Sequence, residues 1–212
     1  SMTDHGRNGA ATKTCPLQRM TKIPKGKIES IVTSLEMRAR PLSPTPTMPA
    51  ERIAILRAEN PTTAFYRFLY NTIGAPWRWW ERRAMDDDTL SAIISDPELE
   101  VYVLYVRGVP AGMCELDCRT SGSVEIAYFG LMPEFIGRGL GGYFLRWSVD
   151  QAWIRDPERV WVHTCTEDHA AALPMYQKIG FQPYEQKTEI IDDPEALFAD
   201  EPVGKAANKN RS

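Results

Sequence analysis

A glycine-rich loop is the part of this 212-residue sequence best suited to chemistry, and it reads Gly137-Arg138-Gly139-Leu140-Gly141-Gly142. Glycines let consecutive backbone N–H groups turn toward a phosphate, because no side chain stands in the way. A helix expected from Gly139 or Leu140 would add the positive end of its dipole at the same place. The loop therefore predicts a site for a ligand that carries a diphosphate.

The same loop spells G-x-G-x-x-G, the pattern of dinucleotide-binding folds, which is a weak signal on its own. In those folds the first glycine follows its strand directly, whereas here residues 131–136 separate Gly137 from a strand that ends at Gly130. Glu167 and Asp168 do end the next strand, so a nucleotide-dependent oxidoreductase stays as an alternative.

Strands and helices are expected through most of the chain. A strand at 30–40 precedes a proline-rich connector, and apolar spacing predicts two short helices within 50–73. The later elements are a helix over 88–95, a hairpin of strands at 101–106 and 111–117, a strand at 124–130, a helix from 139 or 140 to 154, a strand at 159–164, a helix ending at Gly180 and a strand at 181–191.

This order of elements predicts one α/β domain of the α+β kind over residues 28–191, with a mixed sheet flanked by helices. Ligands in such folds bind at the C-terminal ends of strands, so we expect the chemistry between Gly130 and Tyr176. Residues 1–27 and 192–212 are polar and charged without periodicity, and we expect both to be disordered.

Charge and apolar content exclude several classes of partner. The formal net charge of -3 gives no overall attraction for nucleic acid or for an anionic membrane, so neither is expected as a partner. The sequence shows no run of about eighteen apolar residues and no secretory signal pattern, which predicts a cytoplasmic protein.

The four cysteines are Cys15, Cys114, Cys118 and Cys165, a density too low for a disulfide-stapled secreted scaffold. Together with His163, the last three of these cysteines, Cys114, Cys118 and Cys165, could in principle supply zinc ligands. Cys114 and Cys118 would share one face of a strand but lie too far apart for easy shared ligation. We therefore expect no metal.

Two segments carry motifs beyond the glycine loop itself: 125–141, EIAYFGLMPEFIGRGLG, and 168–181, DHAAALPMYQKIGF. The first resembles the fourth strand and pyrophosphate loop of the GNAT N-acetyltransferase superfamily. The second is similar to the family's later helix and its closing tyrosine-to-glycine-phenylalanine signature. The resemblance implies a GNAT-like mixed, mostly antiparallel central sheet. It also implies an N-acetyltransferase that moves an acetyl group from acetyl-CoA to an amine by direct attack in a ternary complex.

The resemblance further implies which residues contact acetyl-CoA. A bulge near residues 129–131 would free a backbone N–H for the thioester carbonyl, and the glycine loop would hold the diphosphate. The implied set is Phe129, Leu131, Met132, Gly137, Arg138, Gly139, Leu140, Gly141, Gly142, His169 and Tyr176. Ile136 stands where the family usually carries glutamine or arginine, which leaves backbone amides to hold the diphosphate there. His169 stands where many members have asparagine.

Two residues match catalytic positions of the family. Glu125 lies where some histone-acetylating members carry a glutamate, and a carboxylate can accept the proton of an amine whose pKa is near about 10. Tyr176 matches the tyrosine that protonates the leaving thiolate in many members. A surface carboxylate and a packing aromatic are the respective alternatives. His163 or His169 could also serve as the base, although a structural hydrogen bond is the commoner role of a lone histidine.

The segment 77–83, WRWWERR, combines aromatic and cationic side chains. We expect a small-molecule or peptide amine to contact Trp77, Trp79 and Tyr128, and the alternative is core tryptophans flanked by solvated arginines. A non-catalytic acyl-CoA-binding module is the main alternative to an enzyme, because Ile136 and Pro174 depart from the family's pattern. A homodimer is left open.

Overall fold

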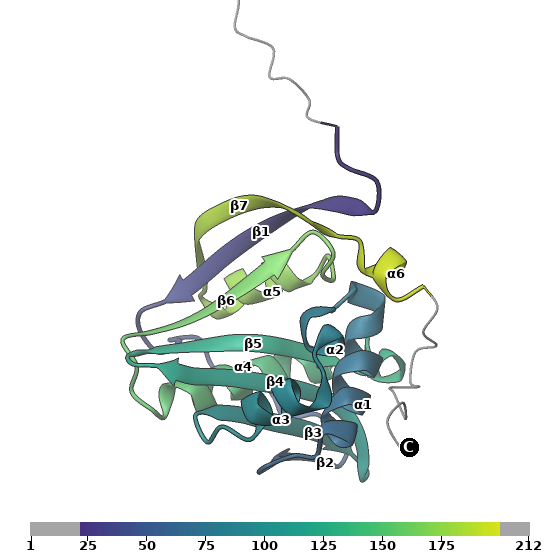
Figure 1. The fold of residues 1–212 in the computed structure, drawn as a ribbon. Coiled ribbons are helices and arrows are strands. Elements are labelled where there is room, and N and C mark those ends of the chain that lie inside the picture. Colours follow the sequence, from purple (N-terminus) through teal and green to yellow (C-terminus); the bar gives the residue numbers. More distant parts are fainter. Residues whose placement is uncertain (1–21, 200–212) are drawn as a thin grey trace, which may run out of the picture.

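One mixed sheet organises the protein. The computed structural model describes residues 22–199, in which seven strands follow the order β2-β3-β4-β5-β6-β1-β7 (Figure 1). The strands are β1 (Lys27–Met37), β2 (Ile53–Arg57), β3 (Leu99–Val106), β4 (Val109–Thr120), β5 (Ser123–Leu131), β6 (Arg159–Cys165) and β7 (Gln182–Asp192). Every neighbouring pair is antiparallel except β5 and β6, which are parallel. The predicted mixed, mostly antiparallel sheet is confirmed.

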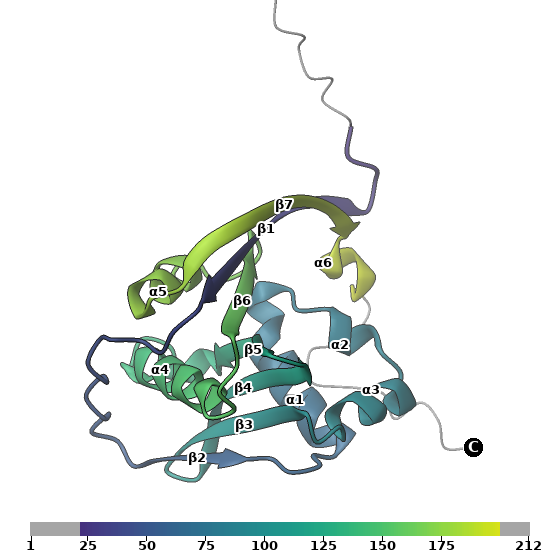
Figure 2. The same ribbon diagram turned by 90° about the vertical axis from the view of Figure 1, so that its left-hand side faces the viewer.

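Helices cover both faces of this sheet. α1 (Thr63–Gly74) and α3 (Asp87–Ile94) pack on one face, and α4 (Leu140–Trp153) and α5 (Ala172–Ile179) pack on the other (Figure 2). The short helices α2 (Glu81–Ala84) and α6 (Pro194–Leu197) lie near the C-terminal end of α1. Because both faces are covered, Val101 and Val103 are buried on one side of β3 while Tyr102 and Leu104 are buried on the other. This explains the continuous apolar run of that strand.

The stretch 50–73 is where the sequence prediction is wrong. Instead of two short helices it forms the edge strand β2 and the single helix α1. β2 pairs with β3 in an antiparallel register that begins at Ile53↔Val106, so pairing across the sheet overrides the local apolar spacing. The helix begins only at Thr63, where the Thr62 side chain accepts a hydrogen bond from the backbone N–H of Phe65.

Smaller differences concern the ends of elements. β1 begins at Lys27, and the remainder of the expected N-terminal arm up to residue 21 lies outside the described residues. α5 ends at Ile179 with Gly180 as its C-cap, so the predicted glycine stop is found. Pro194–Leu197 forms α6, so the expected disorder does not begin at Asp192, and residues 200–212 lie outside the described part of the chain. No helix within residues 22–199 is long and apolar enough to cross a membrane.

Candidate active site

β5 and β6 separate beyond a short parallel ladder. The ladder runs from Ser123↔Arg159 to Ile126↔Val162, whereas β5 continues to Leu131 and β6 continues to Cys165. A cavity of about 310 Å³ lies where the strands diverge, lined by the ends of both strands, the loop before α4, the start of α5 and the segment 77–81. The site therefore lies in the region expected from the sequence, at the C-terminal ends of two parallel strands.

The glycine loop forms one end of this cavity. Gly137 and Gly139 have φ angles of 79° and 76°, in the left-handed region that side chains other than glycine rarely adopt. Gly139 caps the N-terminus of the 14-residue helix α4 without a side-chain hydrogen bond, so the first backbone N–H groups of the helix are available to a ligand. A Cβ added at Gly137, Gly139 or Gly142 would meet no atom within 4 Å, so space lies open beside the loop. These features fit a bound diphosphate.

Two residues of the loop contribute no side chain to the cavity. Leu140 is buried in the core under α4, where it fixes the start of that helix. The Arg138 guanidinium forms an ion pair with Glu51 and lies over the ring of Phe135, 4.8 Å from its centroid. Gly137 and Gly141 line the cavity, with Ile136 beside them. The loop therefore presents backbone groups rather than charged side chains to the cavity, which agrees with an isoleucine at position 136 in place of glutamine or arginine.

The end of β5 presents backbone N–H groups to the cavity. The Met132 N–H donates to the Ala111 carbonyl across the antiparallel β4–β5 pair. Because N–H groups alternate in direction along such a strand, those of Phe129 and Leu131 point away from β4, toward the side that β6 has left. Met132, the residue after β5, is buried under α1 and does not line the cavity, so of the predicted contacts Phe129, Leu131 and Met132 only the first two reach it.

The expected bulge in β5 lies earlier than predicted. The β4–β5 register shifts between Glu115↔Tyr128 and Leu116↔Ile126, which makes Ala127 the extra residue rather than a residue at 129–131. Gly130 has a different role. A Cβ at that position would lie 2.5 Å from a methyl carbon of Ile73, so the glycine permits the close packing of α1 on β5.

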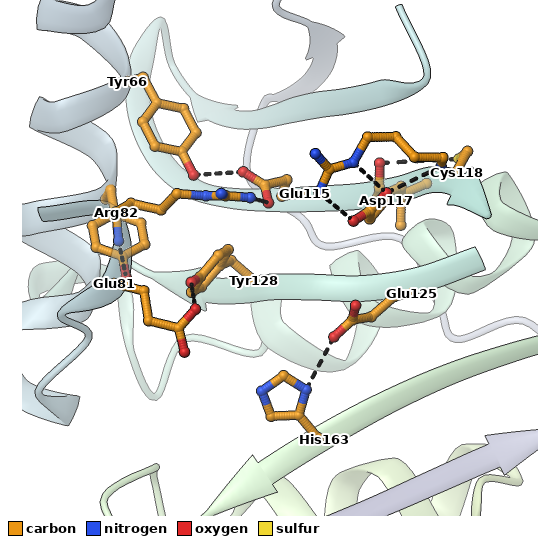
Figure 3. Close-up of polar contacts among 12 residues, drawn as sticks. Tyr66, Glu81, Arg82, Glu115, Asp117, Cys118, Glu125, Tyr128 and His163 are labelled. Atoms are coloured by element: carbon orange, nitrogen blue, oxygen red, sulfur yellow. Dashed lines mark hydrogen bonds and ion pairs between the residues drawn. The ribbon is translucent and has the colours of Figure 1, made fainter. Parts of the chain in front are cut away.

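Glu125 and His163 form a hydrogen-bonded pair at the cavity wall (Figure 3). The Glu125 Oε1 lies 3.0 Å from the His163 Nδ1, and because a carboxylate accepts, Nδ1 carries the proton. His163 lines the cavity and Glu125 does not, and the His163 side chain is 42% exposed against 18% for Glu125. The hydrogen bond to Glu125 raises the pKa of His163, and the charges of Glu125, Asp168 and Glu81 act in the same direction.

Tyr176 is a buried residue that lines the cavity. It is buried against Phe181, with the two rings at 76° and their centroids 5.9 Å apart. Within residues 22–199 its hydroxyl makes no hydrogen bond. Burial, followed by the charge of Asp168, raises the pKa of Tyr176 well above its ordinary value, so the phenol keeps its proton at neutral pH.

His169 and His163 use their Nδ1 atoms in opposite ways, since Nδ1 donates a hydrogen bond in His163 and accepts one in His169. The Ala171 N–H donates to the His169 Nδ1 at 2.9 Å, so a neutral His169 carries its proton on Nε2 and can only donate from there. Its ring lies 4.7 Å from that of Trp77, between the start of α5 and the segment before α2. His169 therefore connects the expected acetyl-CoA region with the expected acceptor region, both of which line one cavity.

Aromatic side chains form another part of the cavity wall. The rings of Tyr70, Trp79 and Tyr128 contact one another with centroids 4.9 to 5.3 Å apart. Trp77 and Trp80 line the cavity beside them. The three residues expected to contact the acceptor, Trp77, Trp79 and Tyr128, are therefore brought together, although Trp79 also packs against the backbone of Gly74.

A buried polar cluster behind this wall was not predicted. The fully buried Glu115 accepts hydrogen bonds from the Tyr66 hydroxyl at 2.5 Å and from the Arg82 guanidinium at 2.9 Å (Figure 3). Arg82 also lies over the Tyr128 ring, 5.6 Å from its centroid. The signal in the sequence was a carboxylate within the otherwise apolar stretch 111–116, where a partner of opposite charge is required. The cluster fixes α2 to the sheet.

No group of three or more histidine, cysteine or acidic side chains in residues 22–199 is arranged to hold a metal ion. Cys114 and Cys118 are buried in the core, and burial raises the pKa of each thiol to about 12. Cys165 lines the cavity, but burial and then the charge of Asp168 raise the pKa of its thiol, so it stays protonated at neutral pH. The arrangement offers no activated thiolate.

Comparison with known proteins identifies the class to which this fold and site belong. The sequence profile of the acetyltransferase (GNAT) family matches residues 66–181, which include most of α1, the glycine loop and Tyr176. The chain belongs to the GNAT acetyltransferase family. No curated protein matches the sequence.

Solved structures share the fold at low sequence identity. A GCN5-related N-acetyltransferase from Sphaerobacter thermophilus is 19% identical with a TM-score of 0.55, over 79% of this chain and 54% of that protein. A tandem GNAT protein from the clavulanic acid biosynthesis pathway is 16% identical with a TM-score of 0.51, over 80% of this chain and 54% of that protein. An aminoglycoside acetyltransferase from an uncultured soil metagenomic sample is 14% identical with a TM-score of 0.50, over 60% and 87%. The chain thus spans about half the length of the first two proteins.

Proposed function

We propose that the protein transfers an acetyl group from acetyl-CoA to a primary amine by direct attack in a ternary complex. The observation that carries the proposal is a single cavity in which separated parallel strands, a glycine loop at a helix N-terminus and a histidine paired with a carboxylate meet. Acetyl-CoA would supply the activated acetyl group as a thioester.

Backbone groups would bind the donor. The N–H groups at Gly137, Gly139 and the first turn of α4 would hold the diphosphate. The N–H groups of Phe129 and Leu131, which point into the gap between β5 and β6, would hold the pantetheine arm. They would also stabilise negative charge on the thioester oxygen during attack. Preorganised N–H donors of this kind cost no reorganisation when the charge develops.

The Glu125–His163 pair is our candidate for the general base. With Nδ1 held by Glu125, the Nε2 of a neutral His163 has a free lone pair and can accept the proton of the attacking amine. Glu125 orients the ring and stabilises the resulting imidazolium. The geometry favours His163 over His169 for this role, because the His169 Nδ1 already accepts from the Ala171 N–H.

Tyr176 would supply the other proton. Tyr176 lines the cavity and keeps its proton at neutral pH, so its hydroxyl would donate to the departing thiolate as the carbon–sulfur bond breaks. One proton then passes from the amine to His163 and one from Tyr176 to the thiolate. Exchange with solvent restores both side chains, and no covalent acyl-enzyme forms.

The test measures thiol release from acetyl-CoA in the presence of a panel of primary amines. In parallel, melting temperatures are compared with and without acetyl-CoA or a nicotinamide dinucleotide, since a ligand at 100 times its Kd stabilises the folded state by about 2.7 kcal/mol. We expect stabilisation by acetyl-CoA and amine-dependent thiol release. Stabilisation without thiol release for any amine would indicate a binding module, and stabilisation by the dinucleotide alone would contradict the proposal.

A further inference from the structure

The acceptor end of the cavity has an unusual composition. Trp77, Trp79 and Trp80 line it together with Tyr70 and Tyr128. Three of these rings pack edge to face or tilted against one another, so they form a fixed wall rather than separate mobile side chains. Buried aromatic surface of this kind contributes to binding both by its area and by specific ring geometry.

One carboxylate at this end is available to a ligand. The Glu81 side chain makes a single long hydrogen bond, accepted from the Tyr128 hydroxyl at 3.5 Å (Figure 3). Its charge also reaches His163 across the cavity and helps to raise the pKa of that ring. A protonated amine in the cavity would therefore be attracted by Glu81 and by the faces of the aromatic rings, both of which favour a cation.

The other carboxylates that line the cavity have partners. Asp168 accepts from the Thr164 hydroxyl at 3.0 Å and from the Cys165 N–H at 2.8 Å. Glu167 accepts from the Ser30 hydroxyl at 2.7 Å. A polycationic acceptor needs several free carboxylates, and the described part of this wall supplies only Glu81.

A carboxylate on the acceptor has no free partner either. Arg78 is the only arginine or lysine among the described residues that line the cavity, and its guanidinium pairs with Glu195 of α6 at 2.9 Å. Ile191 and Pro194 from the same C-terminal segment complete the cavity with apolar surface. An acceptor with an α-carboxylate would have to break the Arg78–Glu195 pair or leave its own charge unpaired.

We propose that the acceptor is a small monoamine with a flat, apolar body and no carboxylate, with its body against Trp77, Trp79 and Tyr128. It enters as an ammonium ion attracted by Glu81, releases one proton to solvent, and passes a second to His163 as its nitrogen attacks the thioester. The proposal rests on the proposed function and names the substrate class for it. A volume of about 310 Å³, shared with the pantetheine arm, suits a small molecule.

Four amines test the proposal on the unmodified protein. 2-Phenylethylamine has the proposed chemistry, butylamine lacks the ring, phenylalanine adds a carboxylate to the same ring, and kanamycin is polycationic. We expect kcat/KM for 2-phenylethylamine to exceed that of each of the other three by at least about tenfold, the effect of one buried ring or one unpaired charge. Equal or better use of phenylalanine or kanamycin would overturn the proposal.

A pair of variants locates the site. Glu81→Gln should raise the KM for 2-phenylethylamine roughly tenfold, as expected for loss of a charge-assisted hydrogen bond, and should leave the KM for acetyl-CoA unchanged. Glu59→Gln, an exposed carboxylate before the opposite end of α1, should change neither. Equal KM values in both variants would overturn the assignment of Glu81.

The same assays separate failure of this inference from failure of the proposed function. Thiol release with butylamine, phenylalanine or kanamycin but not with 2-phenylethylamine contradicts only the substrate class. Absence of thiol release with every amine, and absence of thermal stabilisation by acetyl-CoA, contradicts both. Melting temperatures of the two variants show whether each is folded, and the comparison of amines on the unmodified protein needs no variant.

Discussion

The Glu125 carboxylate and the His163 imidazole meet across adjacent parallel strands, 3.0 Å apart, at the point where those strands begin to separate. Glu125 is opposite Trp161 in the ladder, and His163 is two residues further along β6, on the same face of the sheet. The divergence of β5 and β6 therefore opens the cavity directly beside the imidazole. One structural feature places the proposed base and makes room for the substrate it deprotonates.

The pH dependence of kcat/KM should follow His163. The ring must be neutral to accept a proton, and the hydrogen bond to Glu125 raises its pKa from 6.5, so activity should rise with pH through a value above 6.5. Glu125→Gln removes the carboxylate that raises the pKa of His163 most, so the acidic limb of the pH profile should move to lower pH. The charges of Asp168 and Glu81 should still keep the pKa of His163 partly raised. Rates measured from pH 5 to 9 check the direction.

His163→Gln is the matched variant for this pair. It should lower kcat by about 10²–10⁴-fold and abolish the acidic limb, because a positioned general base contributes that much. Glu125→Gln should reduce the plateau less than His163→Gln does. The reverse order would mean that Glu125 itself is the base and that His163 only orients it.

Tyr176→Phe should lower kcat more than it weakens acetyl-CoA binding. The ring packs against Phe181 and is kept by the substitution, whereas the hydroxyl, which has no partner in residues 22–199, is lost. We expect a decrease in kcat of about 10²-fold, typical of a lost proton donor, and a Kd for acetyl-CoA within about twofold of the original. Titration calorimetry and steady-state rates measure the two quantities. An unchanged kcat would leave Tyr176 as a packing residue.

The local motifs were predictable from sequence, and the long-range contacts were not. The glycine loop, the glycine stop of α5 and the apolar strand β3 follow from residue types and spacing over a few positions. The apolar spacing wrongly predicts a helix at β2, because the hydrogen bonds of this strand come from β3, far along the chain. Local periodicity carries no information on such a partner.

The residues of the candidate site also divide into those that local motifs predict and those that depend on long-range contacts. Glu125 and Tyr176 could be named because they lie at fixed offsets from recognisable motifs. The partner of Glu125 depends on the register of two parallel strands separated by α4, which no motif specifies. The role of Glu81 depends on the fold of the 77–83 segment, because residue types and spacing do not determine which of its side chains line the cavity.

Gly139→Ala should weaken acetyl-CoA binding. The residue has a φ of 76°, and alanine there costs about 1–2 kcal/mol and displaces the N–H groups that start α4. We expect the Kd to rise at least tenfold, since a hydrogen bond to a charged group contributes about 1.5–3 kcal/mol. Gly108→Ala is the control, because it has a φ of 82° and open space but lies in the β3–β4 turn. The Gly108→Ala variant should lose a similar amount of stability and keep the original Kd for acetyl-CoA.

Glu115→Ala should destabilise the fold severely. Removing one partner of a buried ion pair leaves Arg82 charged and unpaired and costs about 3–5 kcal/mol. Asp117→Ala on the same strand breaks the more exposed pair with Arg119 and should cost about 0–1 kcal/mol. Urea unfolding of both variants gives the comparison. Similar losses in the two would mean that Glu115 does not anchor α2 as the contacts indicate.

Gly130→Ala links packing to catalysis. The new methyl group would lie 2.5 Å from Cγ2 of Ile73, and relief of that overlap requires α1 or β5 to move, at about 1–3 kcal/mol. Because Phe129 and Leu131 flank the glycine, movement of β5 would also shift the N–H groups proposed to hold the thioester, and kcat should fall with stability.

The double variant Gly130→Ala/Ile73→Ala distinguishes this overlap from a general defect. Ile73→Ala alone should cost about 2–5 kcal/mol through the cavity it leaves. Together the two changes should cost less than the sum of the single losses by about 0.5–3 kcal/mol, because the methyl group added at position 130 enters the space that the Ile73 side chain vacates. Urea unfolding measures the coupling, and steady-state rates show whether kcat recovers with it. Strict additivity would show that α1 and β5 do not meet at this glycine.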